Sequence, residues 1–386
     1  MDGVMTTKDG GPAAARIAVL LGRSEVRIWG MSAQERLTRQ LGRAGATDVR
    51  SALDGLAPDA QVLLLKVDHA YEQRLVDALA IRPGAALLAE GAPVAAHVTG
   101  AQAEATAAAL LAGDAAALPA GVEALDSEGL GGSYNFKLRK REVAYVIPLN
   151  PGTVAEVENR SFAGSYKGVT DLVTKYVWPK PAQIVTKWCA ERRITPNAVT
   201  LVGLALVFVA FWAFWNGHYL SGLVAAWIMT FLDTVDGKLA RVTLTSSKVG
   251  DVMDHGIDLV HPPFWWWAWI VGLPAAGLPV EHAGLMVFII FAGYILQRVE
   301  EGIFSWAFGM HMHVWRPFDS FFRLITARRN PNLLILTPFA LIGRPDLGMQ
   351  IVVVWIVICF VVHLAQIVQA LAARRRGPIT SWLDAA

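Results

Sequence analysis

Residues 231–258 read FLDTVDGKLARVTLTSSKVGDVMDHGID and place regularly spaced carboxylates within otherwise apolar, helix-length sequence. Asp233 and Asp236 are separated by three positions, and Asp254 and Asp258 by four, so each pair shares one helical face. An unpaired charge at the centre of a membrane-spanning helix costs about 2.5–3.5 kcal/mol, and four would cost roughly 10–14 kcal/mol. Bound cations would offset this cost. A site with oxygen ligands alone favours Mg²⁺ or Mn²⁺ over zinc.

The composition outside this stretch predicts two different domains. The chain has 386 residues, of which 54% are hydrophobic and 17% charged, a low charged fraction for a soluble protein. Residues 1–197 are mixed in character, whereas 198–372 are dominated by long apolar runs. The two cysteines, Cys189 and Cys359, are far apart and support neither a disulfide framework nor a cysteine metal site.

The N-terminal region predicts an α/β domain over residues 16–130, preceded by a disordered leader at 1–15. Short apolar runs that are typical of buried strands alternate with stretches of helical periodicity. The expected strands are 16–22, 60–68 and 85–90, and the expected helices are 32–45, 70–80 and 101–113. This alternation predicts a small doubly wound sheet.

Residues 131–197 are rich in basic and aromatic side chains and predict a juxtamembrane segment. Within 181–193 the apolar residues share one face of a helix while the lysines and arginines point elsewhere. Such a helix fits the headgroup plane of an anionic membrane. An ordinary linker with a solvated basic face is the alternative.

Six membrane spans are expected in an all-α domain at residues 198–373, followed by a tail at 374–386. Their ranges are 198–216, 219–240, 250–273, 283–304, 331–343 and 348–372. The predicted outer loops contain a single basic residue, Arg344, so the positive-inside rule places both termini and the carboxylates at the cytosolic side. We expect an integral protein of a prokaryotic plasma membrane.

The carboxylate stretch resembles the signature of the CDP-alcohol phosphotransferases, also called CDP-alcohol phosphatidyltransferases. The matching positions are Asp233, Asp236, Gly237, Ala240, Arg241, Gly250, Asp254 and Asp258. The resemblance implies transfer of a phosphoalcohol from a CDP-alcohol, of CDP-diacylglycerol or CDP-inositol type, to an acceptor hydroxyl, with release of CMP. It implies that Asp233, Asp236 and Asp254 bind two divalent ions. Asp258 would deprotonate the acceptor and also touch the second ion.

The same resemblance assigns the CDP moiety to Gly237, Arg241 and Ser247. A Cβ at Gly237 would fill the site, and the planar charge of Arg241 suits a diphosphate. Helix packing through a small residue is the alternative for Gly237. Arg328 and Arg329 either bind an anionic acceptor or only satisfy the positive-inside rule.

Two further segments, 134–142 and 165–179, resemble the junction in two-domain enzymes that fuse a cytidylyltransferase to a di-inositol-phosphate phosphate synthase. A cytidylyltransferase of that class needs a glycine-rich loop after its first strand, but residues 21–26 contain one glycine. We therefore expect a shortened, inactive nucleotidyltransferase-like domain that serves in dimerisation, substrate capture or partner binding. The expected assembly is a homodimer in membrane lipid that binds no nucleic acid.

Two other functions remain open from the sequence. An intramembrane prenyltransferase also uses aspartate-bound Mg²⁺, but it gives no role to the glycine and arginine between the carboxylates. A transporter with proton- or ion-relaying carboxylates fits the buried charge less well, because the carboxylates cluster on one side of the membrane. Metal-dependent CMP release distinguishes the phosphotransferase from both.

Overall fold

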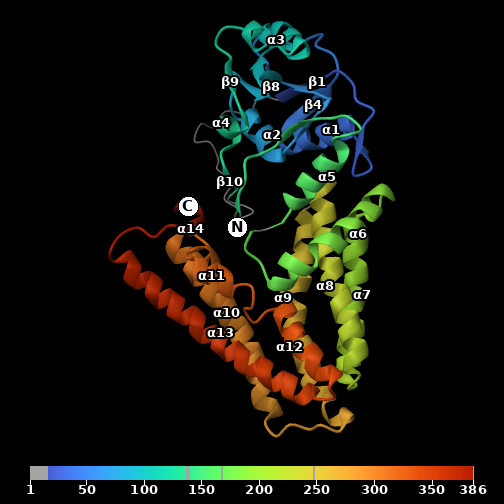
Figure 1. Cartoon of the computed structure of the whole chain (residues 1–386), viewed down its shortest axis with the longest axis vertical. Coiled ribbons are helices and arrows are strands. Elements are labelled where there is room, and N and C mark those ends of the chain that lie inside the picture. The colour runs from blue at the N-terminus through green and yellow to red at the C-terminus, as the bar shows by residue number, and fades with distance from the viewer. Residues whose placement is uncertain (1–15, 136–139, 167, 247, 386) are drawn as a thin grey trace. The chain divides into compact units, whose positions relative to one another are not determined.

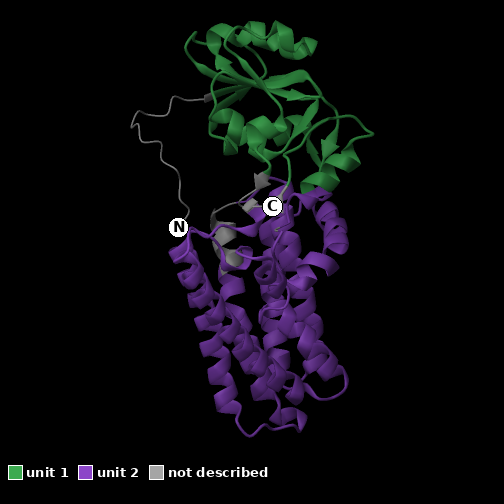
Figure 2. Ribbon diagram, turned by 60° about the vertical axis from the view of Figure 1, so that its left-hand side comes forward, with its two compact units in different colours: residues 1–133, 142–161 green, residues 134–141, 162–386 purple. Residues whose placement is uncertain are grey.

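The computed structural model describes residues 16–135, 140–166, 168–246 and 248–385, and for 248–255 it describes the helical backbone. The expected leader at 1–15 therefore lies outside the described residues. The chain divides into two compact units (Figure 2). Unit 1 comprises residues 1–133 and 142–161, and unit 2 comprises residues 134–141 and 162–386.

Unit 1 is built from short strands and helices (Figure 1). Its strands are β1 Arg16–Leu21, β2 Arg27–Ile28, β3 Met31–Ser32, β4 Ala46–Arg50, β5 Gln61–Lys66, β6 His69–Tyr71, β7 Ala85–Ala89, β8 Ala92–Thr99, β9 Glu123–Leu125 and β12 Val146–Pro148. Its helices are α1 Ala33–Arg43, α2 Gln73–Ala80, α3 Gly100–Ala112, α4 Ser127–Gly131 and most of α5 Val154–Ala163. The helix expected over 70–80 thus begins at Gln73, because Ala70 and Tyr71 belong to β6.

The main sheet of unit 1, as far as its residues are described, has six strands in the order β4-β1-β5-β8-β7-β9. Strand β1 is parallel to β4 and β5, but β8 is antiparallel to both β5 and β7. The sheet is therefore mixed rather than wholly parallel, and β8 is its antiparallel strand. Strand β8 reads APVAAHVT, an alanine-rich run with weak strand propensity. Glu90 and Gly91 both have positive φ, 51° and 86°, as a type I′ turn requires, so β7 and β8 form a tight hairpin.

The core of unit 1 lies between the sheet and its helices. Val62 and Leu64 of β5 pack with Leu110 of α3, and none of the three has exposed surface. The alternate residues, Leu63 and Leu65, point to the opposite face of the sheet and are also buried. The α/β character of the N-terminal region is confirmed.

Unit 2 is helical apart from the two-stranded ribbon β10 Tyr134–Asn135 and β11 Lys140–Arg141. Its helices are α6 Pro179–Glu191, α7 Pro196–Trp215, α8 Tyr219–Val242, α9 Lys248–Gly272, α10 Ala283–Phe308, α11 Pro317–Phe322, α12 Arg329–Leu341, α13 Pro345–Arg374 and α14 Trp382–Ala385. Single helical turns lie at Val173–Val177 (π), Pro274–Ala276 (3₁₀) and Met312–Val314 (3₁₀).

Four helices within the described part of the chain, α7, α8, α10 and α13, are long and apolar enough to cross a membrane. They correspond to four of the six expected spans. Helix α12 has 13 residues, which gives about 20 Å at 1.5 Å per residue. This length is shorter than the hydrocarbon core of about 30 Å. Crossing by α9 and by α12 stays a prediction.

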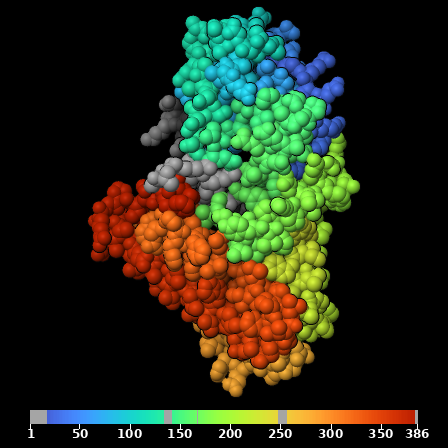
Figure 3. Space-filling view, in the orientation of Figure 1, coloured from blue at the N-terminus to red at the C-terminus, as the bar shows by residue number. Residues whose placement is uncertain are grey.

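The helices of unit 2 pack so that α12 joins two groups. Helix α7 packs against α8 and α9, and α10 packs against α13, while α12 contacts both α8 and α13 (Figure 1). Gly293 allows α10 to approach α13 closely, because a Cβ there would lie 2.3 Å from Cγ2 of Ile356. The residues of α12 and α13 form a continuous orange and red surface in the space-filling view (Figure 3). Through these contacts the start of α12 reaches the carboxylates of α8 and α9.

Candidate functional site

Helix α8 carries the first part of the predicted site. Asp233, Asp236, Gly237 and Arg241 lie within its last three turns, and their spacing places Asp233, Gly237 and Arg241 on adjacent turns of one face. All three line a cavity of about 490 Å³ in unit 2. These three residues of α8 therefore face one cavity.

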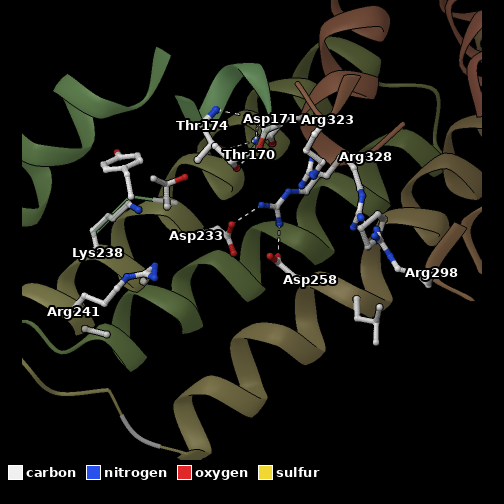
Figure 4. Close-up of a pocket in the computed structure, with 18 of the residues that line it drawn as sticks. Thr170, Asp171, Thr174, Asp233, Lys238, Arg241, Asp258, Arg298, Arg323 and Arg328 are labelled. Atoms are coloured by element: carbon white, nitrogen blue, oxygen red, sulfur yellow. Dashed lines mark hydrogen bonds and ion pairs between the residues drawn. The ribbon is translucent and has the colours of Figure 1, made fainter. Parts of the chain in front are cut away.

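Asp258 of α9 faces Asp233 across this cavity, and Arg329 at the start of α12 bridges them. The guanidinium of Arg329 donates to Oδ2 of Asp233 and to Oδ1 of Asp258, each at 2.5 Å. Figure 4 shows Asp233 and Asp258 directed from two helices toward the same group. The side chains of Arg329 and Asp233 are 12% and 17% exposed, whereas that of Asp258 is 40% exposed. A positively charged group thus lies between the two carboxylates.

Asp236 lies one turn further along α8 than Asp233 and is directed toward α7. It is 3% exposed, and its Oδ2 accepts a 2.6 Å hydrogen bond from the Thr200 hydroxyl of α7. Asp233 and Asp236 both line a second, small cavity beside Thr200. The two carboxylates of this pair therefore reach one small space between α7, α8 and α9.

The side chains of two predicted site residues, Asp254 and Ser247, lie outside what the structure describes. Asp254 lies on the backbone of α9, but its side chain is outside what the structure describes. Ser247 lies outside the described residues altogether. Their roles as metal ligand and nucleotide contact stay predictions.

Gly237 leaves space for the side chain one turn further along α8. A Cβ at Gly237 would lie 2.8 Å from a terminal nitrogen of Arg241. A larger residue there would displace the guanidinium, since the far end of an arginine can move. The atoms that a Cβ at Gly237 would meet thus belong to Arg241 of the same helix, and none of a neighbouring helix lies within 4 Å in the described structure.

Lys238 is a cavity residue that the sequence did not single out, although it stands within the quoted stretch. Its side chain is 4% exposed, and Nζ donates to the Ser165 carbonyl at 2.9 Å. The same ammonium lies 3.5 Å from the ring centroid of Tyr166, which also lines the cavity. Burial raises the pKa of the Tyr166 hydroxyl above its usual value. Lys238 thus fixes the segment before α6 against α8.

A group of arginines lines the other side of the cavity. Arg298, Arg323 and Arg328 lie there together with Arg329. Figure 4 shows Lys238 and Arg241 on one side of Asp233, and Arg298 and Arg328 on the other. Burial lowers the pKa of Arg323, and its Nη1 has no hydrogen-bond partner in the described part of the chain. An unpartnered buried donor in a cationic wall favours binding of an anion.

Asp171 connects this wall to the segment before α6. Its side chain is 8% exposed and accepts hydrogen bonds from the Thr174 backbone at 3.0 Å and from the Asn330 amide at 3.1 Å. Asn330 follows Arg329 directly, so these contacts fix the start of α12. No local pattern in the sequence predicts this role, because Asp171 and Asn330 are 159 positions apart.

Comparison with known proteins agrees with this site. Residues 193–324 match the family model described as CDP-alcohol phosphatidyltransferase. The chain is 29% identical over 133 residues to cholinephosphotransferase 1 of Gallus gallus, covering 30% of this chain and 37% of that protein. It is 36% identical over 80 residues to archaetidylinositol phosphate synthase of Pyrococcus horikoshii, covering 20% of this chain and 42% of that protein. The chain thus spans about two fifths of the length of these curated relatives.

Proposed function

We propose that this chain, whose residues 193–324 form a CDP-alcohol phosphatidyltransferase domain, transfers a phosphoalcohol from a CDP-alcohol to an acceptor hydroxyl and releases CMP. The observation that carries the proposal is the convergence of Asp233 and Asp258, from two helices, on one cationic centre beside Gly237 and Arg241. A prenyltransferase site has no comparable use for that glycine and arginine.

Asp233, Asp236, Asp254 and Asp258 are the residues that would hold two Mg²⁺ or Mn²⁺ ions. The donor set fits, because carboxylate oxygens are the ligands these hard cations prefer. The position of Arg329 between Asp233 and Asp258 supports the fit, since it shows that the two carboxylates already accommodate a positive group. Bound divalent ions would neutralise charge on the diphosphate that is cleaved.

Two side chains of the cavity would bind the donor diphosphate and accept the proton of the acceptor hydroxyl. Arg241 lies beside Gly237 and would bind the diphosphate of the donor. Asp258, whose side chain is 40% exposed, would accept the proton of the acceptor hydroxyl. A new bond forms between the acceptor oxygen and the transferred phosphorus, while the bond from that phosphorus to CMP breaks. The bonding electrons leave with CMP.

The arginine wall supports an acceptor that carries a phosphate. Arg298, Arg323 and Arg328 lie on the Asp258 side of the cavity, where the acceptor hydroxyl must be. Arginine binds phosphate through paired hydrogen bonds. We therefore propose a phosphorylated polyol as acceptor, with either a lipid or a soluble CDP-alcohol as donor.

The charge distribution supports a cytosolic active site in a prokaryotic plasma membrane. Among the loops expected outside, the only basic residue is Arg344, whereas the cavity lies beside Arg298, Arg323, Arg328 and Arg329. Both termini would then be cytosolic. The N-terminal unit as an inactive nucleotidyltransferase-like domain, and assembly into a homodimer, remain predictions from the sequence.

The function is tested by measuring CMP release from the purified full chain in detergent. CDP-diacylglycerol and CDP-inositol serve as donors, each with inositol phosphate or with inositol as acceptor. We expect release only with Mg²⁺ or Mn²⁺. The phosphorylated acceptor should react about tenfold faster or more, since a charged hydrogen bond contributes about 1.5–3 kcal/mol.

The matched variants are Asp258→Asn and Asp126→Asn. Asp258→Asn should lower turnover by about 10²–10⁴-fold, which is the usual contribution of a positioned general base. Asp126 is an exposed helix cap in unit 1, and asparagine preserves its cap, so that variant should keep full activity. CMP release without a divalent ion, or unchanged turnover in Asp258→Asn, would overturn the proposal.

A further inference from the structure

A second group of metal-ligating side chains lies where α10 and α13 pack together, apart from the aspartates. Glu301 belongs to α10, His363 to α13, and His313 to the short turn Met312–Val314. One ligand atom from each of the three residues lies within 4.8 Å of the others. The two imidazole rings have centroids 5.5 Å apart.

Three of the four imidazole nitrogens in this group are buried without a hydrogen bond to a described residue, although Nε2 of His313 pairs with Oε1 of Glu301. His363 has no exposed surface, and neither ring nitrogen has a hydrogen-bond partner in the described structure. His313 is 4% exposed, and its Nδ1 also has none. A buried polar group left without a partner costs about 1–3 kcal/mol. An ion coordinated by these nitrogens would remove that cost.

Glu300 adds a second carboxylate beside the histidines. It is 6% exposed, and its Oε2 lies 3.5 Å from Nδ1 of His363, yet neither carboxylate oxygen makes a hydrogen bond to a described residue. Ionisable residues inside membrane helices are rare and mark functional positions. The cluster therefore holds two carboxylates and two imidazoles, of which Glu300 and the two histidines are buried and Glu301 is 24% exposed.

We propose that Glu301, His313 and His363 form a binding site for a zinc-like divalent ion, distinct from the aspartate site. Two imidazoles and one carboxylate are a ligand set that suits Zn²⁺, whereas oxygen ligands alone suit Mg²⁺. Tetrahedral ligands about 2.0–2.1 Å from zinc lie roughly 3.4 Å apart. Small side-chain rotations would bring the three ligand atoms to that spacing.

Glu301 connects this site to the cavity. Its Oε1 pairs with Arg328 and lies 3.4 Å from Nε2 of His313, and its Oε2 lies 3.5 Å from Arg298. An ion bound by Glu301 therefore competes with two arginines of the cavity wall, and the nearby Glu300 helps to balance the added charge. Because Glu301→Gln would also change the arginines, the histidines are the better residues to test.

The test uses Co²⁺ and Zn²⁺ binding to the chelator-treated full chain in detergent, with excess Mg²⁺ present to occupy the aspartates. We expect one equivalent of Co²⁺ with the intense visible absorption of a tetrahedral site, which Zn²⁺ displaces. His363→Gln and His313→Gln should each weaken binding by tenfold or more. His282→Gln, which changes an exposed histidine at the start of α10, should leave binding unchanged.

The outcomes are decisive even where one variant fails to fold, because the wild-type chain is titrated first. Absence of a stoichiometric tetrahedral ion in the wild type would overturn the proposal. Binding that persists at full strength in folded His363→Gln or His313→Gln, as judged by unfolding temperature, would also overturn it. CMP release is measured separately, so failure of this site leaves the proposed transfer reaction intact.

Discussion

Among the described residues, unit 2 leaves many more large apolar side chains exposed than unit 1 does. In unit 1, Leu64 and Leu110 lie between the sheet and α3 without exposed surface. In unit 2, large apolar residues such as Phe208 of α7 and Phe288 of α10 are 65% and 67% exposed, while Asp236 and Lys238 are buried. The difference follows from the surroundings: water drives apolar groups inward, whereas lipid also accepts them on the outer face. Polar groups share the interior of unit 2 with an apolar core around Trp265 and Trp269.

The largest expected effect tests this contrast with one substitution in each unit. Leu64→Ala should destabilise unit 1 by about 2–5 kcal/mol, because it leaves a cavity in a packed core. Leu296→Ala in α10, where the leucine is 44% exposed, should change stability by less than about 0.5 kcal/mol, because lipid is as apolar as leucine. Thermal unfolding in detergent measures both. Equal losses would show that Leu296 is covered by protein rather than by lipid.

The next effect concerns charge in the interior of unit 2. Arg329→Gln leaves Asp233 and Asp258 facing each other without the bridging guanidinium. Breaking a buried ion pair costs about 3–5 kcal/mol, and we expect the lower end because Asp258 is 40% exposed. Added Mn²⁺ should restore most of the unfolding temperature, since it would replace the missing cation.

The matched control for this variant is Arg344→Gln. Arg344 pairs with Asp346 at 2.7 Å, but its side chain is 47% exposed, so the change should cost about 0–1 kcal/mol and should not respond to Mn²⁺. If Mn²⁺ failed to stabilise Arg329→Gln more than the control, the carboxylates would not form a metal site in this chain.

The smallest effect concerns a feature that both units share. Ser32 caps α1 by accepting from the Glu35 backbone at 3.1 Å, and Thr195 caps α7 by accepting from the Ala198 backbone at 3.3 Å. Ser32→Ala and Thr195→Ala should each cost about 1 kcal/mol. Urea and thermal unfolding compare the two. A much larger loss at Thr195 would mean that its cap lies away from water, unlike that of Ser32.

The fold was predictable where local pattern is strong. The apolar runs located α7, α8, α10 and α13 to within a few residues, because a span needs about 20 apolar residues in a row. Strand β8 was missed because its alanines give weak strand propensity and its partner β5 lies about thirty positions earlier. The antiparallel pairing of β8 with β5 and β7 depends on how all the strands of the sheet pack together.

The site residues likewise include some that local spacing predicts and others that depend on tertiary contacts. The sequence spacing pairs Asp233 with Asp236 on one face, and in the structure both line one small cavity beside Thr200. The sequence allows Arg329 either to bind an anionic acceptor or only to satisfy the positive-inside rule, because nothing near it in the chain shows that it contacts Asp233. Lys238 lies within the motif, but its role depends on the hydrogen bond to the Ser165 carbonyl, which the sequence does not indicate.

The sequence by itself determined the helical periodicity, the membrane-length runs and the family signature, because these depend on residues close together in the chain. Only the tertiary structure decided that Arg329 lies between Asp233 and Asp258, which are 96 and 71 positions away. It likewise brought Glu301, His313 and His363 together from two helices and a turn. Contacts between residues so far apart in sequence follow from how the helices pack. Packing depends on the shape of every contacting surface rather than on local spacing.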